Sequence, residues 1–194
     1  MAEVLNEVEM EMKPHLEAIL DYIGEDSQRE GLLETPKRVI QSWKELFSGY
    51  NEDPAEILSK TFSETEDYDQ IVLLRNCHFT SFCEHHQLPI LGKVHVGYLA
   101  DNNVVGISKL ARLVRCFAHR FQIQERMTKE IANAIMEHLK PKGVGVVVSG
   151  THLCMSARGI KSVNSEMVTA AMEGVFKHNT DGIKDEFYKM IELR

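Results

Sequence analysis

The chain has 194 residues, of which 43% are hydrophobic and 26% are charged, and its formal net charge is −7. This composition is that of a globular protein long enough for one domain with a helical appendage, and the acidic balance argues against non-specific binding of nucleic-acid phosphates. No apolar run approaches the roughly 20 residues of a membrane span, and the acidic start is unlike a signal peptide, so we expect no membrane contact.

Two helices are predicted near the N-terminus. Apolar residues recur at helical spacing over 5–23. A second helix is predicted to begin with Thr35 as its N-cap and Pro36 in its first turn. We therefore assign residues 1–60 to an N-terminal helical region and residues 61–194 to the main domain.

The main domain is predicted to contain two pairs of strands separated by two helices. The expected elements are, in order, strands 71–74 and 94–99, helices 110–117 and 127–139, strands 144–158 and 167–176, and a last helix 183–191. Strands that follow strands, with helices grouped between the pairs, indicate an antiparallel sheet of the α+β class.

The cysteines and histidines indicate metal or thiol chemistry rather than a disulfide framework. Four cysteines and nine histidines are spread irregularly through the chain, which suits a reducing cytoplasm. Cys83 and His86 stand three residues apart, so one turn of chain presents a thiolate and an imidazole to one ion. Alternation in the third predicted strand places His152, Cys154 and Arg158 on one face.

Convergence of Cys83, His86 and Cys154 would give three zinc-preferring ligands and an open fourth position, as in catalytic zinc sites. Zinc would lower the pKa of a bound water to about 7. His85 and His152 would then be available to transfer protons near neutral pH. On spacing alone, a closed structural site or a set of thiols and histidines without metal has equal weight. The closed site would take its fourth ligand from Cys77, His78, His95 or Cys116.

Basic residues at the start of the first central helix predict a phosphate site. Ser108 is expected to be the N-cap of this helix, whose free backbone amides favour a phosphate. Lys109 and Arg112 add positive charge there, and Arg38 and Arg158 could complete a pocket for a polyphosphate. The alternative, that these arginines are only solvated, stays open.

The second central helix begins with Gln124 and Glu125. A glutamate in a first turn is favoured by the helix dipole and commonly has no further role. A carboxylate can also accept two parallel hydrogen bonds from the ring N–H and amino group of guanine, a donor pair that adenine lacks. Glu125 is therefore a candidate for base recognition.

Four ordered motifs resemble those of the type I GTP cyclohydrolases. They are Cys83-Glu84-His85-His86, Gly106-Ile107-Ser108-Lys109-Leu110-Ala111-Arg112, Gln122-Ile123-Gln124-Glu125-Arg126 and His152-Leu153-Cys154-Met155. The resemblance covers nearly everything except the first helix. It implies that residues 61–194 form a catalytic domain with the tunnelling fold, in which sheets of several subunits join into a barrel. It further implies a homo-oligomer, typically a decamer of two stacked pentamers, with active sites between subunits, where Glu125 would reach in across an interface.

The resemblance also implies a role for each candidate residue. The zinc ligands would be Cys83, His86 and Cys154, the catalytic histidines His85 and His152, the triphosphate contacts Arg38, Ser108, Lys109, Arg112 and Arg158, and the guanine contacts Gln124 and Glu125. His152 would protonate the imidazole ring of the purine.

The implied reaction is zinc-dependent hydrolysis of GTP at carbon 8. It releases formate and gives 7,8-dihydroneopterin triphosphate, the first step of folate and pterin biosynthesis. The alternative is a non-catalytic, zinc-stabilised nucleotide-binding module, which would bind nucleotide without turnover. Zinc-dependent base deamination is less attractive because its His-x-Glu and Pro-Cys-x-x-Cys pairing is absent.

Overall fold

The computed structural model describes residues 6–63 and 68–192. The chain divides into two compact units, Met1–Ser48 and Gly49–Arg194. Leu5, the first residue of the first predicted helix, lies outside the described residues.

The N-terminal unit contains both predicted helices, α1 (Glu7–Tyr22) and α2 (Thr35–Leu46). The start of α2 differs from the prediction in one detail. Glu34 is the N-cap, and its side chain makes no capping hydrogen bond, so the prediction that Thr35 caps this helix is wrong. Thr35 and Pro36 instead form the first turn, where a proline costs little because its missing N–H would have had no partner.

The second unit holds the remaining elements. After α2 they are, in chain order, η1 (Ser48–Asn51), α3 (Pro54–Leu58), β1 (Thr61–Phe62), β2 (Ile71–Cys83), β3 (Pro89–Leu99), β4 (Val104–Val105), α4 (Ile107–Ala118), β5 (Phe121–Gln122), α5 (Gln124–His138), β6 (Gly143–His152), α6 (Leu153–Ser156), β7 (Met167–Gly174), α7 (Val175–His178), η2 (Thr180–Gly182) and α8 (Ile183–Glu192). In the part of the chain that the structure describes, no helix combines the length and the apolar character that crossing a membrane requires.

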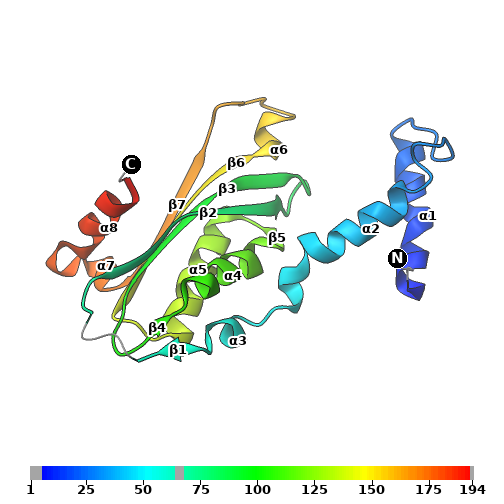
Figure 1. The fold of residues 1–194 in the computed structure, drawn as a ribbon. Coiled ribbons are helices and arrows are strands. Elements are labelled where there is room, and N and C mark those ends of the chain that lie inside the picture. Colours follow the sequence, from blue (N-terminus) through cyan, green and yellow to red (C-terminus); the bar gives the residue numbers. More distant parts are fainter. Residues whose placement is uncertain (1–5, 64–67, 193–194) are drawn as a thin grey trace. The chain divides into compact units, whose positions relative to one another are not determined.

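The main sheet has five strands in the order β5–β2–β3–β6–β7 (Figure 1). The pairs β2–β3, β3–β6 and β6–β7 are antiparallel, and only the short β5 runs parallel to β2. The helices α4 and α5 come between the two long strand pairs in the chain. The predicted α+β class and its ββααββ order, which the tunnelling fold requires, are therefore confirmed.

Strand β2 is much longer than the predicted strand 71–74. It continues to Cys83 and contains a β-bulge between Leu74 and Cys77 in its pairing with β3. Asn76, within the bulge, has a φ of 57°. Because a bulge shifts the side chains that follow it to the other face, it interrupts the alternation that marks a strand. The second half of β2 was therefore not visible in the pattern, although it ends at a predicted metal ligand.

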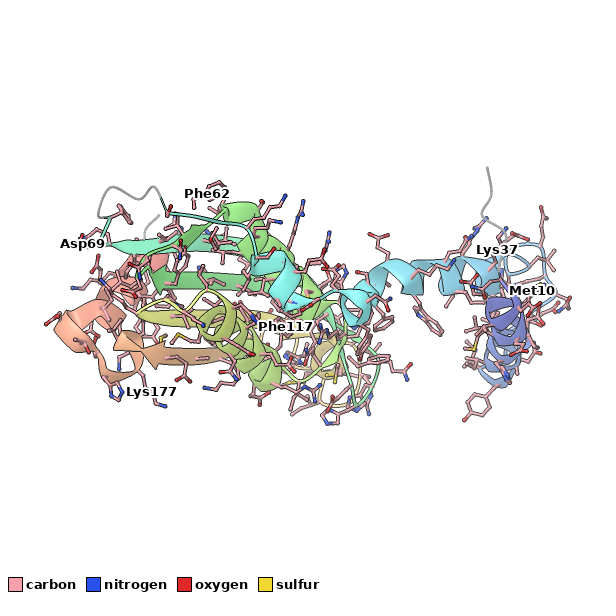
Figure 2. All side chains as sticks on the ribbon, turned by 90° about the horizontal axis from the view of Figure 1, so that it is seen from below. Met10, Lys37, Phe62, Asp69, Phe117 and Lys177 are labelled. Carbon is pink, nitrogen blue, oxygen red and sulfur yellow. The ribbon has the colours of Figure 1, made fainter. Side chains whose placement is uncertain are left out.

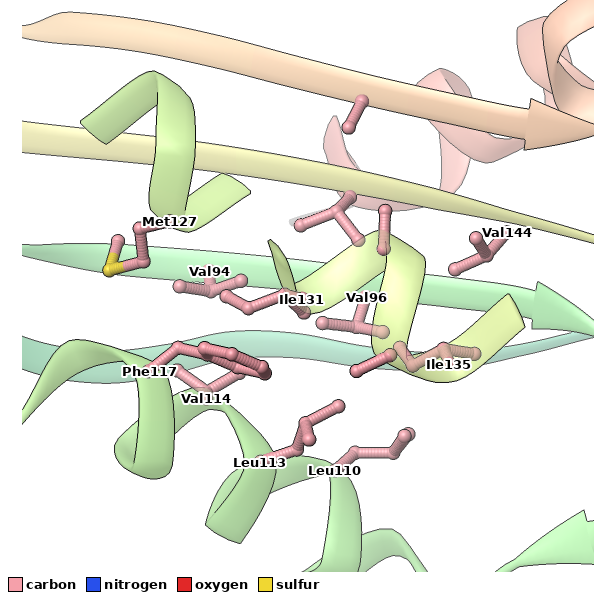
Figure 3. Close-up of a cluster of buried hydrophobic side chains, with 14 of the residues drawn as sticks. Val94, Val96, Leu110, Leu113, Val114, Phe117, Met127, Ile131, Ile135 and Val144 are labelled. Carbon is pink, nitrogen blue, oxygen red and sulfur yellow. The ribbon is translucent and has the colours of Figure 1, made fainter. Parts of the chain in front are cut away.

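The main core lies between one face of the sheet and the helices α4 and α5. Val94 and Val96 of β3 lie in the same buried cluster as Leu113 of α4 and Ile131 and Ile135 of α5 (Figure 3). All five side chains are fully buried. Burying a side chain of this size stabilises a fold by about 1.5–3 kcal/mol, so this layer fixes both helices on the sheet.

A second, two-stranded sheet holds the start of α4. Strand β1 pairs with β4 in antiparallel fashion, with Thr61 opposite Val105 and Phe62 opposite Val104. Phe62 is 60% exposed and projects from the surface (Figure 2). Because β4 leads directly into α4, this small sheet positions the predicted phosphate residues.

The other face of the main sheet is covered at one end by α7 and α8. Phe187 of α8 is fully buried in a separate cluster with Phe176, Ile71 and Val147. A Cβ at Gly97 on β3 would lie 2.7 Å from the Phe187 ring, so only glycine lets the ring approach the sheet this closely. Phe187 is thus the main anchor of the C-terminal helix.

We expect Phe187→Ala to lower the free energy of unfolding by about 3–5 kcal/mol, because it empties a fully buried aromatic site. Urea unfolding followed by circular dichroism measures the change. Tyr188→Ala is the matched control, since the neighbouring ring is 36% exposed. Equal losses for both variants would contradict the assignment of Phe187 as the anchor.

Candidate metal centre and active site

Three predicted metal ligands come together at one end of the main sheet. Cys83 is the last residue of β2, His86 lies in the turn that leads to β3, and Cys154 lies in α6. Their sulfur and nitrogen donor atoms all lie within 4.8 Å of one another. The β2–β3 turn and α6 lie at the same end of the sheet (Figure 1). The predicted convergence of these residues is therefore observed.

The turn after β2 is closed by backbone hydrogen bonds. The amide of Cys83 donates to the carbonyl of Leu88 at 2.9 Å, and the amide of Gln87 donates to the carbonyl of Cys83 at 2.8 Å. Gln87 has a φ of 55°, a left-handed conformation that reverses the chain. This tight turn brings His86 back beside the thiol, with 3.8 Å between His86 Nδ1 and Cys83 Sγ.

The segment that supplies Cys154 is not the strand that the sequence predicted. Strand β6 ends at His152, and Leu153–Ser156 forms the short helix α6, so His152, Cys154 and Arg158 do not share a strand face. The hydroxyl of Ser156 donates to the carbonyl of His152 at 3.4 Å, which helps to close this turn. A four-residue helix contains too few positions for its period to be distinguished from strand alternation.

The three donors fit a tetrahedral zinc ion. Usual zinc–sulfur and zinc–nitrogen distances place neighbouring ligand atoms about 3.6 Å apart, close to the 3.8 Å between Cys83 Sγ and His86 Nδ1. Burial and the neighbouring Cys83 thiol raise the pKa of Cys154, while the charge of Arg158 lowers it. Two thiolates this close together therefore require a cation, which a divalent ion with soft-ligand preference provides.

The closed structural site lacks support. Within residues 6–63 and 68–192, the only group of three or more His, Cys, Asp or Glu donors within this distance consists of Cys83, His86 and Cys154. None of the four proposed fourth ligands belongs to that group: Cys77, His78, His95 and Cys116. The Cys116 thiol, for example, contacts the carbonyls of Gly49 and Glu52 instead.

His152 lies at the end of β6, half-buried and held by one side chain. Its Nε2 is 2.9 Å from Oε1 of Gln124, the first residue of α5. Burial lowers the pKa of His152, and the nearby negative charge of Glu125 opposes this shift. A cavity of about 270 Å³ lies beside the ring, lined in part by Gly150, Met155 and Met167. An imidazole at the wall of such a cavity can exchange a proton with a bound ligand.

Other predicted residues surround the same centre. His85 is exposed, and its Nδ1 lies 3.7 Å from Cys83 Sγ. The charges of Glu125 and Arg158 act on His152 and Cys154 of the same chain. Within one chain the charge of Glu125, at the start of α5, already acts on His152. The expectation that Glu125 reaches in across a subunit interface stays a prediction.

The predicted phosphate residues lie elsewhere. Ser108, Lys109 and Arg112 are in the first half of α4, whose far end leads through β5 to the strand that carries Cys83. Ten helical residues between Ser108 and the end of α4 span about 15 Å. Strand β4, which leads into α4, lies at the opposite end of the sheet from α6 (Figure 1). Arg38 belongs to α2 in the N-terminal unit.

The predicted N-cap of α4 is also wrong. Gly106 is the N-cap, and Ser108 is the second residue of the helix. Glycine at this position costs only a few tenths of a kcal/mol relative to a side-chain cap, so the two alternatives are hard to separate from sequence. Ser108 still lies in the first turn, where backbone amides have no helical partner.

An ion pair that the sequence does not predict links the turn carrying His86 to α5. Arg126 Nη2 lies 2.5 Å from Glu84 Oε2, and Arg126 Nε donates to Gln122 Oε1 at 3.0 Å. Gln122, only 1% exposed, in turn donates to Glu130 at 2.9 Å. Glu84 and Arg126 each stand in one of the four motifs, but nothing in the spacing of the motifs predicts that the two side chains meet across 42 residues.

The chain is similar to known proteins over most of its length. Residues 12–192 match the family model described as GTP cyclohydrolase I. The protein named GTP cyclohydrolase 1 from Wolinella succinogenes is 54% identical over 168 residues, which are 87% of this chain and 89% of that protein. Its namesake from Rickettsia felis is 51% identical over 166 residues, or 86% and 87% of the two chains. Among solved structures, the archaeosine synthase QueF-Like in the apo form matches with a TM-score of 0.46 and 18% identity, over 54% of this chain and 94% of that one.

Proposed function

The chain belongs to the GTP cyclohydrolase I family, and on this premise we propose that it binds zinc through Cys83, His86 and Cys154 and hydrolyses GTP at carbon 8 of guanine. The products are formate and 7,8-dihydroneopterin triphosphate, the first step of folate and pterin biosynthesis. The observation that carries the proposal is the three-ligand group beside His152, because a site with three protein ligands leaves a coordination position for chemistry.

The metal would activate the water nucleophile, and the histidines would transfer protons. Zinc held by these three residues would act as a Lewis acid, lower the pKa of a bound water to about 7, and so supply the nucleophile. His152 protonates the imidazole ring of the purine, which makes carbon 8 more electrophilic. His85, exposed beside Cys83, is a second proton carrier at the open side of the centre.

Substrate recognition rests on charged side chains around the cavity. Glu125 accepts hydrogen bonds from the guanine N–H and amino groups, since its exposed carboxylate lies beside His152. Arg158 contacts the triphosphate from the Cys154 side of the site. Gln124 remains a predicted guanine contact, although its side chain is buried and turned towards His152.

We further propose that the active site is completed by other copies of the chain. Ser108, Lys109 and Arg112 lie at the far end of α4 from the metal ligands of their own chain. Strand β7 and most of β2 are paired on one side only in the described sheet. Pairing of such edges between copies closes a ring and would bring the phosphate residues of one subunit, and Arg38, to the zinc site of another. A decamer of two stacked pentamers is the assembly that we propose.

Incubation of the zinc-loaded protein with GTP tests the proposal. We expect stoichiometric formate and, after oxidation, a fluorescent pterin, and we expect a chelator to stop both. GTP that is bound but recovered intact would overturn the catalytic proposal and indicate a nucleotide-binding module instead.

The ion pair between Glu84 and Arg126 should tune the metal affinity. We expect Arg126→Met to weaken zinc binding about tenfold, because the turn that carries His86 loses its link to α5. Competition with a chromogenic chelator measures this affinity. Arg115→Met is the control, since Arg115 forms a comparable exposed pair with Glu52 at 3.3 Å. Unchanged zinc affinity in Arg126→Met would show that the turn holds its shape without the pair.

A further inference from the structure

Two glutamines, one at the end of β5 and one at the start of α5, are buried to the same extent but have different surroundings. Gln122 and Gln124 are each 1% exposed, and only Gln124 contacts His152. We propose that Gln124 is a positioning residue that holds His152 in one orientation and one tautomer, rather than a residue that reads guanine. This inference rests on the proposed function, because it assigns a role relative to the proton transfer by His152.

The hydrogen bonds of Gln124 define which way its amide points. Its Nε2 lies 2.9 Å from the carbonyl oxygen of Met167, 3.2 Å from that of Val148 and 3.2 Å from the hydroxyl of Thr169. Carbonyl oxygens only accept hydrogen bonds, so the amide nitrogen must face β6 and β7. The amide oxygen is then the atom that faces His152.

The orientation of the amide fixes the state of the ring. Gln124 Oε1 can only accept, so His152 Nε2, at 2.9 Å, carries a hydrogen and donates it. In the neutral ring the other nitrogen, Nδ1, is then unprotonated. The proton that passes between His152 and the substrate therefore uses Nδ1, while Nε2 stays bonded to Gln124.

Gly150 gives independent support for this contact. A Cβ at Gly150 on β6 would lie 2.8 Å from Gln124 Oε1, so a larger residue would push the oxygen away from its position. Because Gly150 has no side chain, the amide of Gln124 can lie against β6 next to His152. Strand β6 therefore leaves room at Gly150 for the hydrogen bond between Gln124 and His152.

Gln124 and the neighbouring Glu125 point in different directions, which is why we assign them different roles. Successive helical residues point about 100° apart, which turns Gln124 into the core and leaves Glu125 exposed. A guanine contact by the Gln124 side chain would require breaking its bonds to two carbonyls and to His152. Glu125 can meet the base without losing any of these bonds.

The test compares Gln124→Met with Thr169→Val, which removes one partner of the amide but does not touch His152. For Gln124→Met we expect kcat for formate release to fall about 10–100-fold, with KM for GTP changed less than about threefold and zinc content unchanged. Thr169→Val should retain wild-type kcat. Gly150→Ala should reproduce the loss of kcat while all hydrogen-bonding groups remain, which keeps the proposal testable if Gln124→Met does not fold.

A second comparison separates positioning from base recognition. Calorimetric titration of GTP into zinc-loaded His152→Ala, with and without Gln124→Met, should give the same Kd if Gln124 acts only through His152. A Kd at least tenfold weaker in the double variant would overturn the proposal and assign Gln124 to guanine. Wild-type kcat in both Gln124→Met and Gly150→Ala would overturn it too. Failure of the proposed function itself would appear differently, as absence of formate from the wild-type enzyme.

Discussion

Replacing Cys154 by alanine is expected to abolish zinc binding and turnover while the fold is retained. Cys154 supplies one of three donors, and two ligands hold zinc poorly, so we expect less than about 0.1 zinc per chain and at least a 10³-fold lower kcat, about the scale of a lost activated water. The residue lies in the short helix α6, beyond the end of β6, and is only partly buried. It packs only at the margin of the main core, so we expect the sheet and its helices to form without it.

Metal analysis and circular dichroism distinguish the two roles that a zinc site can have. A catalytic site predicts an unchanged helix and strand spectrum after metal loss, whereas a structural site predicts unfolding. Cys77→Ala is the control, because Cys77 is also half-buried and burial also raises its pKa, yet it is not in the ligand group. Unfolding of Cys154→Ala alone would assign the zinc to structure.

The fold could be predicted from sequence for those elements whose apolar residues repeat at the spacing of a helix or a strand. The apolar positions of α4 and α5 repeat at helical spacing, and these same side chains fill the core. Two predicted strands, 71–74 and 144–158, have wrong ends for different physical reasons. The bulge near Cys77 shifts the alternation within β2, and α6 is too short to show any period. The short helix α6 carries the predicted ligand Cys154, whereas the bulge lies in the middle of β2, well before Cys83.

The sequence predicts which residues could carry the chemistry of the site. It does not predict which other residues hold those side chains in position. Softness and spacing single out Cys83, His86 and Cys154 as candidate ligands, and the structure brings their donor atoms together. The contacts that orient them depend on pairs far apart in the chain. Gln124 meets His152 across 28 residues, and no local pattern encodes that approach. The candidate reacting groups are therefore easier to predict from sequence than the residues that orient them.

The distribution of charge within one chain supports the proposal that the active site is shared between copies. One end of the sheet carries the candidate metal ligands together with His152, Glu125 and Arg158. The start of α4 carries the predicted phosphate residues Ser108, Lys109 and Arg112. A net charge of −7 cannot attract a triphosphate by itself, so its cations must be gathered locally. Assembly through the strand edges, as proposed, would gather them, and catalysis would then depend on subunit contacts.

His152→Ala is expected to lower kcat for formate release by about 10²–10⁴-fold, the usual contribution of a positioned general acid. Zinc content and the Kd for GTP should stay near wild type, because His152 is absent from the ligand group and Glu125 remains in place. This pattern differs from that of Cys154→Ala, which loses metal and rate together. The separation matters because the two residues are only two positions apart in the chain.

His78→Ala provides the control for the loss of a histidine, since His78 is an exposed residue on β2 outside the metal group. It should turn over GTP at the wild-type rate. If His152→Ala instead loses zinc, the ring acts by shaping the turn into α6 rather than by moving a proton. Retained zinc with slow turnover would place the barrier in proton transfer to the purine, where the Nε2 bond to Gln124 directs Nδ1 towards the base.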